Sequence, residues 1–271
     1  MQKSYERLKK QEGIPTVPKE RRIRPIHIWQ SAAAILFLLL ASSVYLSTVG
    51  TKAETDLLQQ YIPIAEMRSL TLPDGTKVQL NSKSTLLYPQ EFTGDSRSVF
   101  LLGEANFKVK PDKKRPFIVK SNDLQITALG TEFNVSAYPE SQEIATTLIS
   151  GSIRVAYNNL TTSVILHPNE QFAYNRNNKK YDLSNPDMDD VTAWQRGELV
   201  LQKMTLTDII NVLERKYPYA FVYSIKNLKN DRFSFRFKDN APLEEVMEII
   251  VNVVGQMDYR IVEDKCYLTR I

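Results

Sequence analysis

One bond in the sequence carries a side chain that could react with its own backbone. Gly130-Thr131 follows an alternating apolar run that ends at Ala128. In a strained turn, a threonine hydroxyl can attack the preceding carbonyl carbon and form an ester, which water then hydrolyses. A bulge or a tight bend between two strands is the alternative explanation for the glycine. The sequence therefore predicts a candidate self-cleavage bond at Gly130-Thr131, with a purely structural turn as the alternative.

The other reactive residue types form no catalytic or metal-binding pattern. His27 and His167 lack the neighbouring residues that a catalytic triad or a metal pair requires. Asp187, Asp189 and Asp190 could bind calcium, but the acidic start of a helix or a solvated linker explains them better. A single cysteine allows neither an intramolecular disulfide nor a cysteine-built zinc site. We therefore predict that the protein is not an enzyme and has no cofactor or metal site.

A long apolar run near the start of the chain contains no charged side chain. It extends from Ile26 to Thr51. A helix rises about 1.5 Å per residue, so roughly 20 apolar residues cross the ~30 Å hydrocarbon layer of a membrane. The residues expected in contact with the membrane are Trp29, Leu36, Leu38, Leu39, Leu40 and Tyr45. We predict a transmembrane helix over residues 26–49; a cleaved signal peptide and a buried soluble helix are the alternatives.

The distribution of charge orients the predicted helix. Residues 1–25 carry eight basic and three acidic side chains, whereas the whole chain has a net charge of only +4. Basic flanks of membrane helices stay in the cytoplasm, so the N-terminus should be cytoplasmic and the bulk of the chain should lie across the membrane. The nearly neutral remainder has no electrostatic reason to bind nucleic acid directly.

The stretch after a polar spacer at residues 50–66 has the alternation of β-strands. Short runs recur every eight to twelve residues, with turn signals such as Pro73-Asp74-Gly75 and Asn158-Asn159 between them. The alternating apolar pairs are Val78 and Leu80, Phe107 and Val109, Phe117 and Val119, Ile126 and Ala128, Phe133 and Val135, Ile153 and Val155, Val164 and Leu166, and Phe172 and Tyr174. The pattern predicts an all-β domain over residues 67–175, as a sandwich, a barrel or a solenoid.

The last part of the chain mixes helices and strands. A polar linker is expected at residues 176–196, followed by an α+β domain at 197–271. Two apolar stripes at helical spacing predict two helices, each followed by strands. The first stripe runs from Leu206 to Tyr217 and the second from Leu243 to Val254. We predict an open sheet with both helices on one face, so the fold class is mainly β with a small α+β domain and one transmembrane helix.

Several blocks of the β region resemble the FecR domain of anti-sigma factors. The blocks are residues 72–81, 84–89, 92–94, 97–99, 102–109, 115–119, 129–135 and 148–152. The part at 197–271 is similar to the domain that follows FecR in the long-tailed branch of the family. That domain looks like the short N-terminal (STN) module of secretins and TonB-dependent transducers.

The resemblance implies a signal-transduction protein of the inner membrane that regulates transcription. In such systems, the periplasmic signalling domain of a TonB-dependent outer-membrane transducer passes a signal to the FecR-like protein, which regulates an ECF-type sigma factor inside. The resemblance places transducer binding within residues 197–271. Some members cut themselves at a Gly-Thr bond that matches Gly130-Thr131.

Two alternatives stay open at this point. Family members carry a longer helical cytoplasmic domain than residues 1–25, so the native product starts earlier or sigma-factor binding is lost. The second function is a membrane-anchored periplasmic scaffold, or a glycan- or protein-binding module without sigma-factor output. That function would need exposed aromatic side chains on the β domain; Tyr138, Tyr157 and Tyr174 are available for it, with a position in the core as the alternative.

Overall fold

The computed structural model describes residues 25–50, 56–224, 231–238 and 241–270. It divides into two compact units, residues 1–54 and 55–271. The short cytoplasmic tail expected at residues 1–25 lies outside the described residues except for Pro25.

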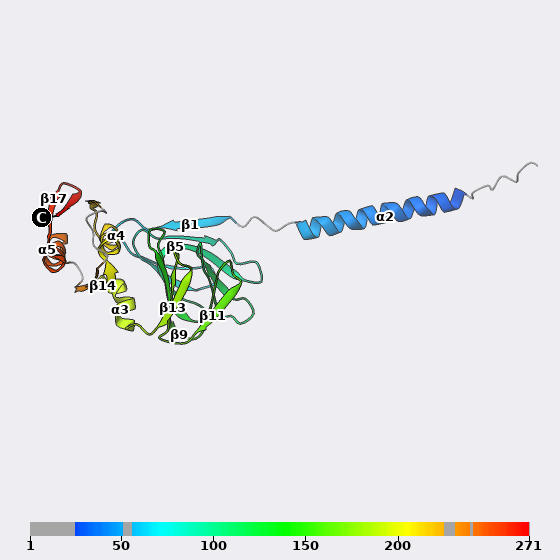
Figure 1. Ribbon diagram of the computed structural model, residues 1–271. Helices are drawn as coiled ribbons and strands as arrows, with labels where there is room; N and C mark the ends of the chain where they lie inside the picture. The colour runs from blue at the N-terminus through cyan, green and yellow to red at the C-terminus, as the bar shows by residue number, and fades with distance from the viewer. Residues whose placement is uncertain (1–24, 51–55, 225–230, 239–240, 271) are drawn as a thin grey trace, which may run out of the picture. The chain divides into compact units, whose positions relative to one another are not determined.

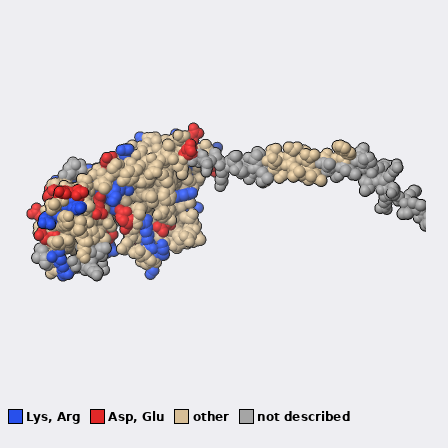
Figure 2. Space-filling view, turned by 90° about the horizontal axis from the view of Figure 1, so that it is seen from above, with Lys and Arg blue, Asp and Glu red and all other residues tan. Residues whose placement is uncertain are grey.

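Helix α2, Pro25–Gly50, is the whole described part of the first unit. Its described side chains are residues 29–30 and 33–45, and they are exposed, with Trp29 at 77% and Leu38 at 67%. Figure 2 shows this described surface without a charged side chain. Over the part of the chain that is described, no helix has the length and apolar character that crossing a membrane requires. The predicted span therefore stays a prediction.

The second unit begins with thirteen strands that form one curled sheet (Figure 1). The strands are β1 (Leu57–Tyr61), β2 (Arg68–Thr71), β3 (Lys77–Leu80), β4 (Thr85–Pro89), β5 (Arg97–Lys108), β6 (Phe117–Lys120), β7 (Gln125–Ala128), β8 (Glu132–Ala137), β9 (Glu143–Ser150), β10 (Ile153–Tyr157), β11 (Thr162–Leu166), β12 (Gln171–Asn175) and β13 (Lys180–Ser184). The longest path through the sheet is β11-β10-β7-β6-β5-β8-β9-β12-β13.

Strand β5 joins the two halves of this sheet. Its first half pairs with β4 and β6, and its second half pairs with β3 and β8. The side chains of β5 that lie in the core alternate along the strand, with a glycine at position 103: Val99, Leu101, Ala105 and Phe107. The two halves close over one hydrophobic core that extends from Ile62 to Tyr174. The mainly β character predicted from the sequence is confirmed, and the architecture is a curled sheet built around one long strand.

The sheet extends beyond the predicted limits at both ends. Strand β1 lies in the stretch predicted as a spacer, and β13 lies in the stretch predicted as a linker. Four of the five side chains on each strand are exposed, so neither strand shows the alternation that a half-buried strand requires. Backbone pairing to β4 and β12 holds them in place.

The rest of the second unit contains short helices, two longer helices and two small sheets. These elements are α3 (Met188–Thr192), η1 (Ala193–Arg196), β14 (Leu199–Thr205), α4 (Leu206–Lys216), β15 (Ala220–Val222), β16 (Arg232–Phe237), α5 (Leu243–Val254), β17 (Met257–Val262) and β18 (Lys265–Arg270). Strands β14 and β16 form one sheet, and β15, β18 and β17 form the other. We call residues 197–270 the C-terminal module.

The C-terminal module differs from the predicted open sheet. Helix α4 contacts β14 of one sheet and β15 of the other, and α5 contacts β17. One core joins both helices to both sheets, and it includes Leu213, Val246 and Cys266. Periodicity identifies the buried stripe of each helix, but it cannot show that the neighbouring strands divide between two sheets.

Local sequence explains where the helices begin and end. The Thr205 hydroxyl accepts a hydrogen bond from the backbone N–H of Asp208 and so caps the start of α4. Pro242 immediately precedes α5, where its missing N–H costs nothing. Gly255 ends α5 with a positive φ of 67°. The Thr205 cap fixes where α4 begins, and α4 contributes the side chains that meet the β domain.

Candidate functional site

The Gly130-Thr131 bond lies in the turn between β7 and β8. Gly130 has a φ of +152°, which favours glycine, and a Cβ atom there would lie 2.8 Å from Cα of Pro111. The carbonyl oxygen of Thr131 accepts a hydrogen bond from the N–H of Val109 over 2.9 Å. Two constraints, the backbone conformation and the close approach of Pro111, therefore require a glycine at this turn.

The Thr131 side chain is buried beside a second glycine. A Cβ atom at Gly151 would lie 2.6 Å from Cγ2 of Thr131, so the absence of a side chain at 151 makes room for the threonine. Among the described residues, Oγ1 of Thr131 has no hydrogen-bond partner. The hydroxyl is therefore not engaged in a capping or cross-strand bond with a described residue.

The acidic residues of the predicted linker have structural partners. Asp187 caps α3 by accepting a hydrogen bond from the N–H of Asp189 over 2.9 Å. Asp189 and Asp190 form ion pairs with Arg236 of β16, and Asp189 also pairs with Arg196. The hydrogen bond from Arg236 lowers the pKa of the Asp189 carboxyl. In the described residues, no group of three potential ligands is arranged around a metal position.

The histidines do not join any such group. His167 lies in the turn before β12, where its N–H donates to Oε2 of Glu170 over 2.8 Å. The side chain of His27 is outside the described residues. Neither histidine is brought to the Gly130-Thr131 turn by an observed contact.

The three tyrosines proposed as a glycan-binding surface are not exposed. Tyr138, Tyr157 and Tyr174 are all buried. Tyr157 packs against the rings of Phe172 and Tyr181, inside the core of the β domain. The sequence left surface and core positions open for them, because the same alternation marks an aromatic core residue and an aromatic surface residue, and the sheet's curl decides which face is inside.

The structure reveals a contact between the β domain and the C-terminal module that the sequence did not indicate. The guanidinium of Arg215, on α4, stacks on the ring of Tyr138 at 3.8 Å and donates to Oε1 of Glu140 over 2.7 Å. The backbone oxygen of Arg215 accepts a hydrogen bond from the N–H of Ala65 over 3.0 Å. Tyr138 is itself fixed, because its hydroxyl donates to the backbone oxygen of Ser82.

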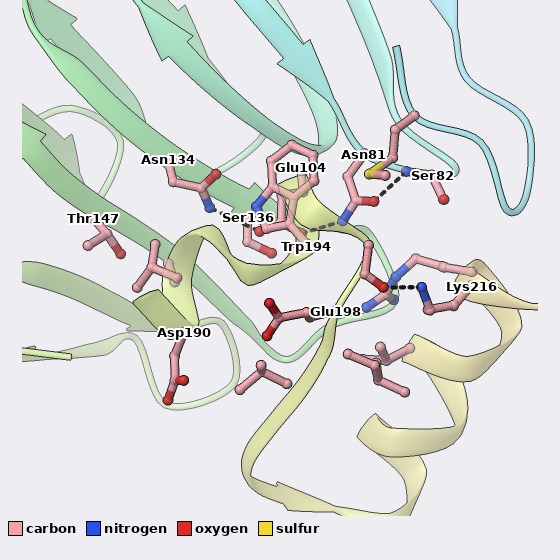
Figure 3. Close-up of a pocket in the computed structure, with 18 of the residues that line it drawn as sticks. Asn81, Ser82, Glu104, Asn134, Ser136, Thr147, Asp190, Trp194, Glu198 and Lys216 are labelled. Atoms are coloured by element: carbon pink, nitrogen blue, oxygen red, sulfur yellow. Dashed lines mark hydrogen bonds between the residues drawn. The ribbon is translucent and has the colours of Figure 1, made fainter. Parts of the chain in front are cut away.

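A cavity of about 260 Å³ lies beside this contact, between the outer face of the sheet and the C-terminal module (Figure 3). At its floor, the Nδ2 atoms of Asn81 and Asn134 donate to the two carboxylate oxygens of Glu104 over 2.8 and 2.9 Å. Burial raises the pKa of the Glu104 carboxyl above its ordinary value of 4.5, although both amides and the charge of Arg215 act in the opposite direction. Glu104 is half-buried and lines the cavity.

Both parts of the second unit contribute to the cavity wall. The sheet contributes Glu104, Asn134, Ser136, Ala145, Thr147 and Gln171, and the α3 to α4 region contributes Asp190, Trp194, Glu198, Met204, Val212, Arg215 and Lys216. Alternation places Glu104 and Asn134 on the face of their strands opposite the core, so the sequence alone would expose them to solvent. No local signal shows that another module covers that face.

Comparisons with known proteins match both parts of the chain. Residues 62–154 match the family model described as FecR protein, and residues 198–268 match the model described as FecR, C-terminal. A crystal structure at 2.50 Å of a candidate anti-sigma factor from Parabacteroides distasonis ATCC 8503 is 34% identical, with a TM-score of 0.75. The match covers 80% of this chain and 100% of that one.

A second crystal structure, at 1.65 Å, carries the same description and organism. It is 34% identical with a TM-score of 0.74, and the match covers 79% of this chain and 99% of that one. No curated protein matches the chain.

Proposed function

Because the chain belongs to the FecR family of anti-sigma factors, we propose that it relays a signal across the inner membrane to an ECF-type sigma factor. The observation that carries the proposal is the 34% identity to the candidate anti-sigma factor over the whole of that chain. The family supports a regulatory role rather than a catalytic one. In this proposal, the second unit receives the signal and the sigma factor binds on the opposite side of the membrane.

The proposed location depends on helix α2. Its 26 residues include no Asp, Glu, Lys or Arg, and its described apolar side chains are exposed. Large exposed apolar surfaces are rare on soluble proteins and are stabilised in lipid. With eight basic residues in 1–25, the proposed orientation has a cytoplasmic N-terminus and a periplasmic second unit.

The proposed input is the periplasmic signalling domain of a TonB-dependent transducer, bound by the C-terminal module. Strands β16 and β17 each have one neighbour in their sheets, which leaves a second backbone edge on each of these described strands. An extended partner segment can pair with such an edge through main-chain hydrogen bonds. The STN-like character of the module is part of this proposal.

The relay also has a proposed cleavage step at Gly130-Thr131. The Thr131 hydroxyl would attack the Gly130 carbonyl carbon, and its proton would pass to the departing amide nitrogen, which becomes the amino group of Thr131. Water would then hydrolyse the ester, leaving a carboxylate on Gly130 and restoring the hydroxyl. The buried, unpartnered Oγ1 supports this proposal because no hydrogen bond to a described residue has to be broken first.

Purification of the full-length chain tests the relay as a whole. Membranes solubilised from the native host should yield the chain together with an ECF-type sigma factor, and a C-terminal reporter active only in the periplasm should be active. A chain that fractionates with the membrane but never retains a sigma factor would favour the scaffold function. A reporter active only in the cytoplasm would contradict the proposed orientation.

A further inference from the structure

The cavity between the sheet and the C-terminal module has a wall of aligned hydrogen-bonding side chains. Strand register places three polar residues side by side across the outer face: Asn134, Thr147 and Gln171. Asn134 is only 5% exposed, and Thr147 is buried as well. Polar side chains in a row on a covered sheet face are costly unless each one has a partner.

Two polar atoms of residues that line the cavity have no hydrogen-bond partner among the described residues. Oδ1 of Asn134 and Nε1 of Trp194, both on residues that line the cavity, are buried without a hydrogen bond. The first atom is an acceptor and the second is a donor. Nδ2 of Asn134 is committed to Glu104, which fixes the direction of the amide. Both atoms are fully buried and do not open into the cavity, whereas Glu104, Ser136 and Gln171 are half-buried polar residues of its wall and include both donors and acceptors.

The charged residues around the cavity are largely neutralised by the protein itself. Glu198 pairs with Arg196 and Arg236, Asp190 pairs with Arg236, and Arg215 pairs with Glu140. The Glu104 carboxylate is instead held by two neutral amides, an arrangement that leaves its remaining lone pairs free to accept from hydroxyl groups. An anion would be repelled by Glu104, and a cation would meet Arg215 and Lys216 in the same wall.

We propose that this cavity binds a neutral polyhydroxylated small molecule about the size of one sugar ring. The volume of about 260 Å³ is somewhat below the ~300–1,000 Å³ typical of the pockets that hold drug-sized ligands. Hydroxyl groups both donate and accept, which matches the mixed wall, and the Trp194 indole offers apolar surface for the ring carbons. The ligand contacts both parts of the second unit, so its binding favours their observed arrangement. This inference does not depend on the transducer or the sigma factor.

Fluorescence of the full-length chain in detergent tests the site. The sequence contains two tryptophans, so Trp29→Phe leaves Trp194 as the only one. D-Glucose, D-galactose, D-xylose and N-acetyl-D-glucosamine are titrated separately, with choline and acetate as charged probes. At least one sugar should give a saturable change with a Kd on the order of 1 mM, as expected for so few non-hydrogen atoms.

Two variants test whether the fluorescence response to sugar comes from binding in the cavity. Glu104→Gln removes the carboxylate with little change of shape, and Ala145→Leu fills the cavity from β9. Each should weaken sugar binding at least tenfold. The matched controls are Glu143→Gln on the same strand as Ala145 and Ala156→Leu on β10, both outside the cavity wall, and they should bind as the parent does.

The proposal is wrong under either of two results with folded protein. One is no saturable response to any of the four sugars up to roughly 100 mM, about a hundredfold above the expected Kd. The other is a response to choline or acetate alone, which would assign the cavity to a charged ligand. Circular dichroism of every variant separates loss of binding from loss of folding.

Discussion

Arg215 and Glu140 lie 75 residues apart in the sequence and form the ion pair that joins the C-terminal module to the β domain. The Arg215 side chain is 11% exposed, and its guanidinium also stacks on Tyr138. A single side chain on α4 therefore makes two interactions with the β domain. The adjoining residue, Lys216, donates to the backbone oxygen of Gly197 beside the same cavity.

Removal of Arg215 should weaken the contact between the modules. Arg215→Ala loses both the stacking and the ion pair, and it leaves the Glu140 carboxylate without this partner. We expect a loss of about 1–3 kcal/mol in the free energy of unfolding, because the stacked cation is largely shielded from water. Thermal or denaturant unfolding of the full chain measures the change, and hydrogen exchange at the Ala65 N–H reports the contact locally.

Arg260 provides the matched control for Arg215. It also lies over a tyrosine, Tyr267, but at 5.7 Å and on an exposed strand. Arg260→Ala should change stability by less than about 0.5 kcal/mol, as is usual for surface positions. Equal effects of the two substitutions would show that the Arg215 contact has no special role in joining the modules.

Glu104 should give the protein a distinctive dependence on pH. Burial raises the pKa of this carboxyl in the folded state above 4.5, so the folded chain holds the proton more tightly than the unfolded chain does. The contribution of the protonated Glu104 carboxyl to the free energy of unfolding is therefore complete below pH 4.5. It is lost as the pH rises through the folded-state pKa. The melting temperature of the parent minus that of Glu104→Gln should therefore decrease as the pH rises through the folded-state pKa of Glu104.

Glu198 should show the opposite pH effect and so serves as the comparison. Hydrogen bonds from Arg196 and Arg236 lower the pKa of its carboxyl. Its contribution is present above pH 4.5 and is lost as the pH falls through the folded-state pKa. If Glu104→Gln and Glu198→Gln change the melting temperature with the same pH trend, the assigned environment of Glu104 is incorrect.

The fold should not accept a side chain at position 103, where β5 passes close to Ser84. A Cβ atom there would lie 2.7 Å from Cα of Ser84, and the φ of +103° favours glycine independently. We expect Gly103→Ala to lower the free energy of unfolding by about 2–4 kcal/mol, from the backbone clash and the strained φ together. Gly94→Ala is the control, since nothing lies within 4 Å of its Cβ position. A small effect at Gly103 would mean that the two strands can separate at little cost.

Period-two alternation was sufficient to predict the β domain, because strands such as β5 and β8 bury one face in a single core. Phe107, Phe133 and Val135 are all buried at the predicted positions. The edge strands β1 and β13 have no such pattern, since backbone pairing alone holds them. Local periodicity fails where burial depends on the chain's distant parts.

The candidate site shows this limit most clearly. Arg215 lies off the apolar stripe of α4, and Glu104 lies on the outward face of β5, so a sequence pattern assigns both to solvent. They are enclosed because the C-terminal module covers the sheet, an arrangement between segments roughly a hundred residues apart that no local propensity encodes.

Self-cleavage at Gly130-Thr131 should divide the chain without separating its parts. Strand β7 stays paired with β6 and β10, and β8 stays paired with β5 and β9, so both fragments remain in one sheet. Purified wild-type chain should therefore elute as one species under native conditions and give two bands under denaturing conditions, with the new N-terminus at Thr131.

Thr131→Ser should keep the cleavage because the hydroxyl remains, whereas Thr131→Val should abolish it while preserving the packing against Gly151. Thr127→Ala on β7, a threonine outside the turn, should cleave as the wild type does. Intact wild-type chain after prolonged incubation, indistinguishable from Thr131→Val, would assign the threonine a purely structural role.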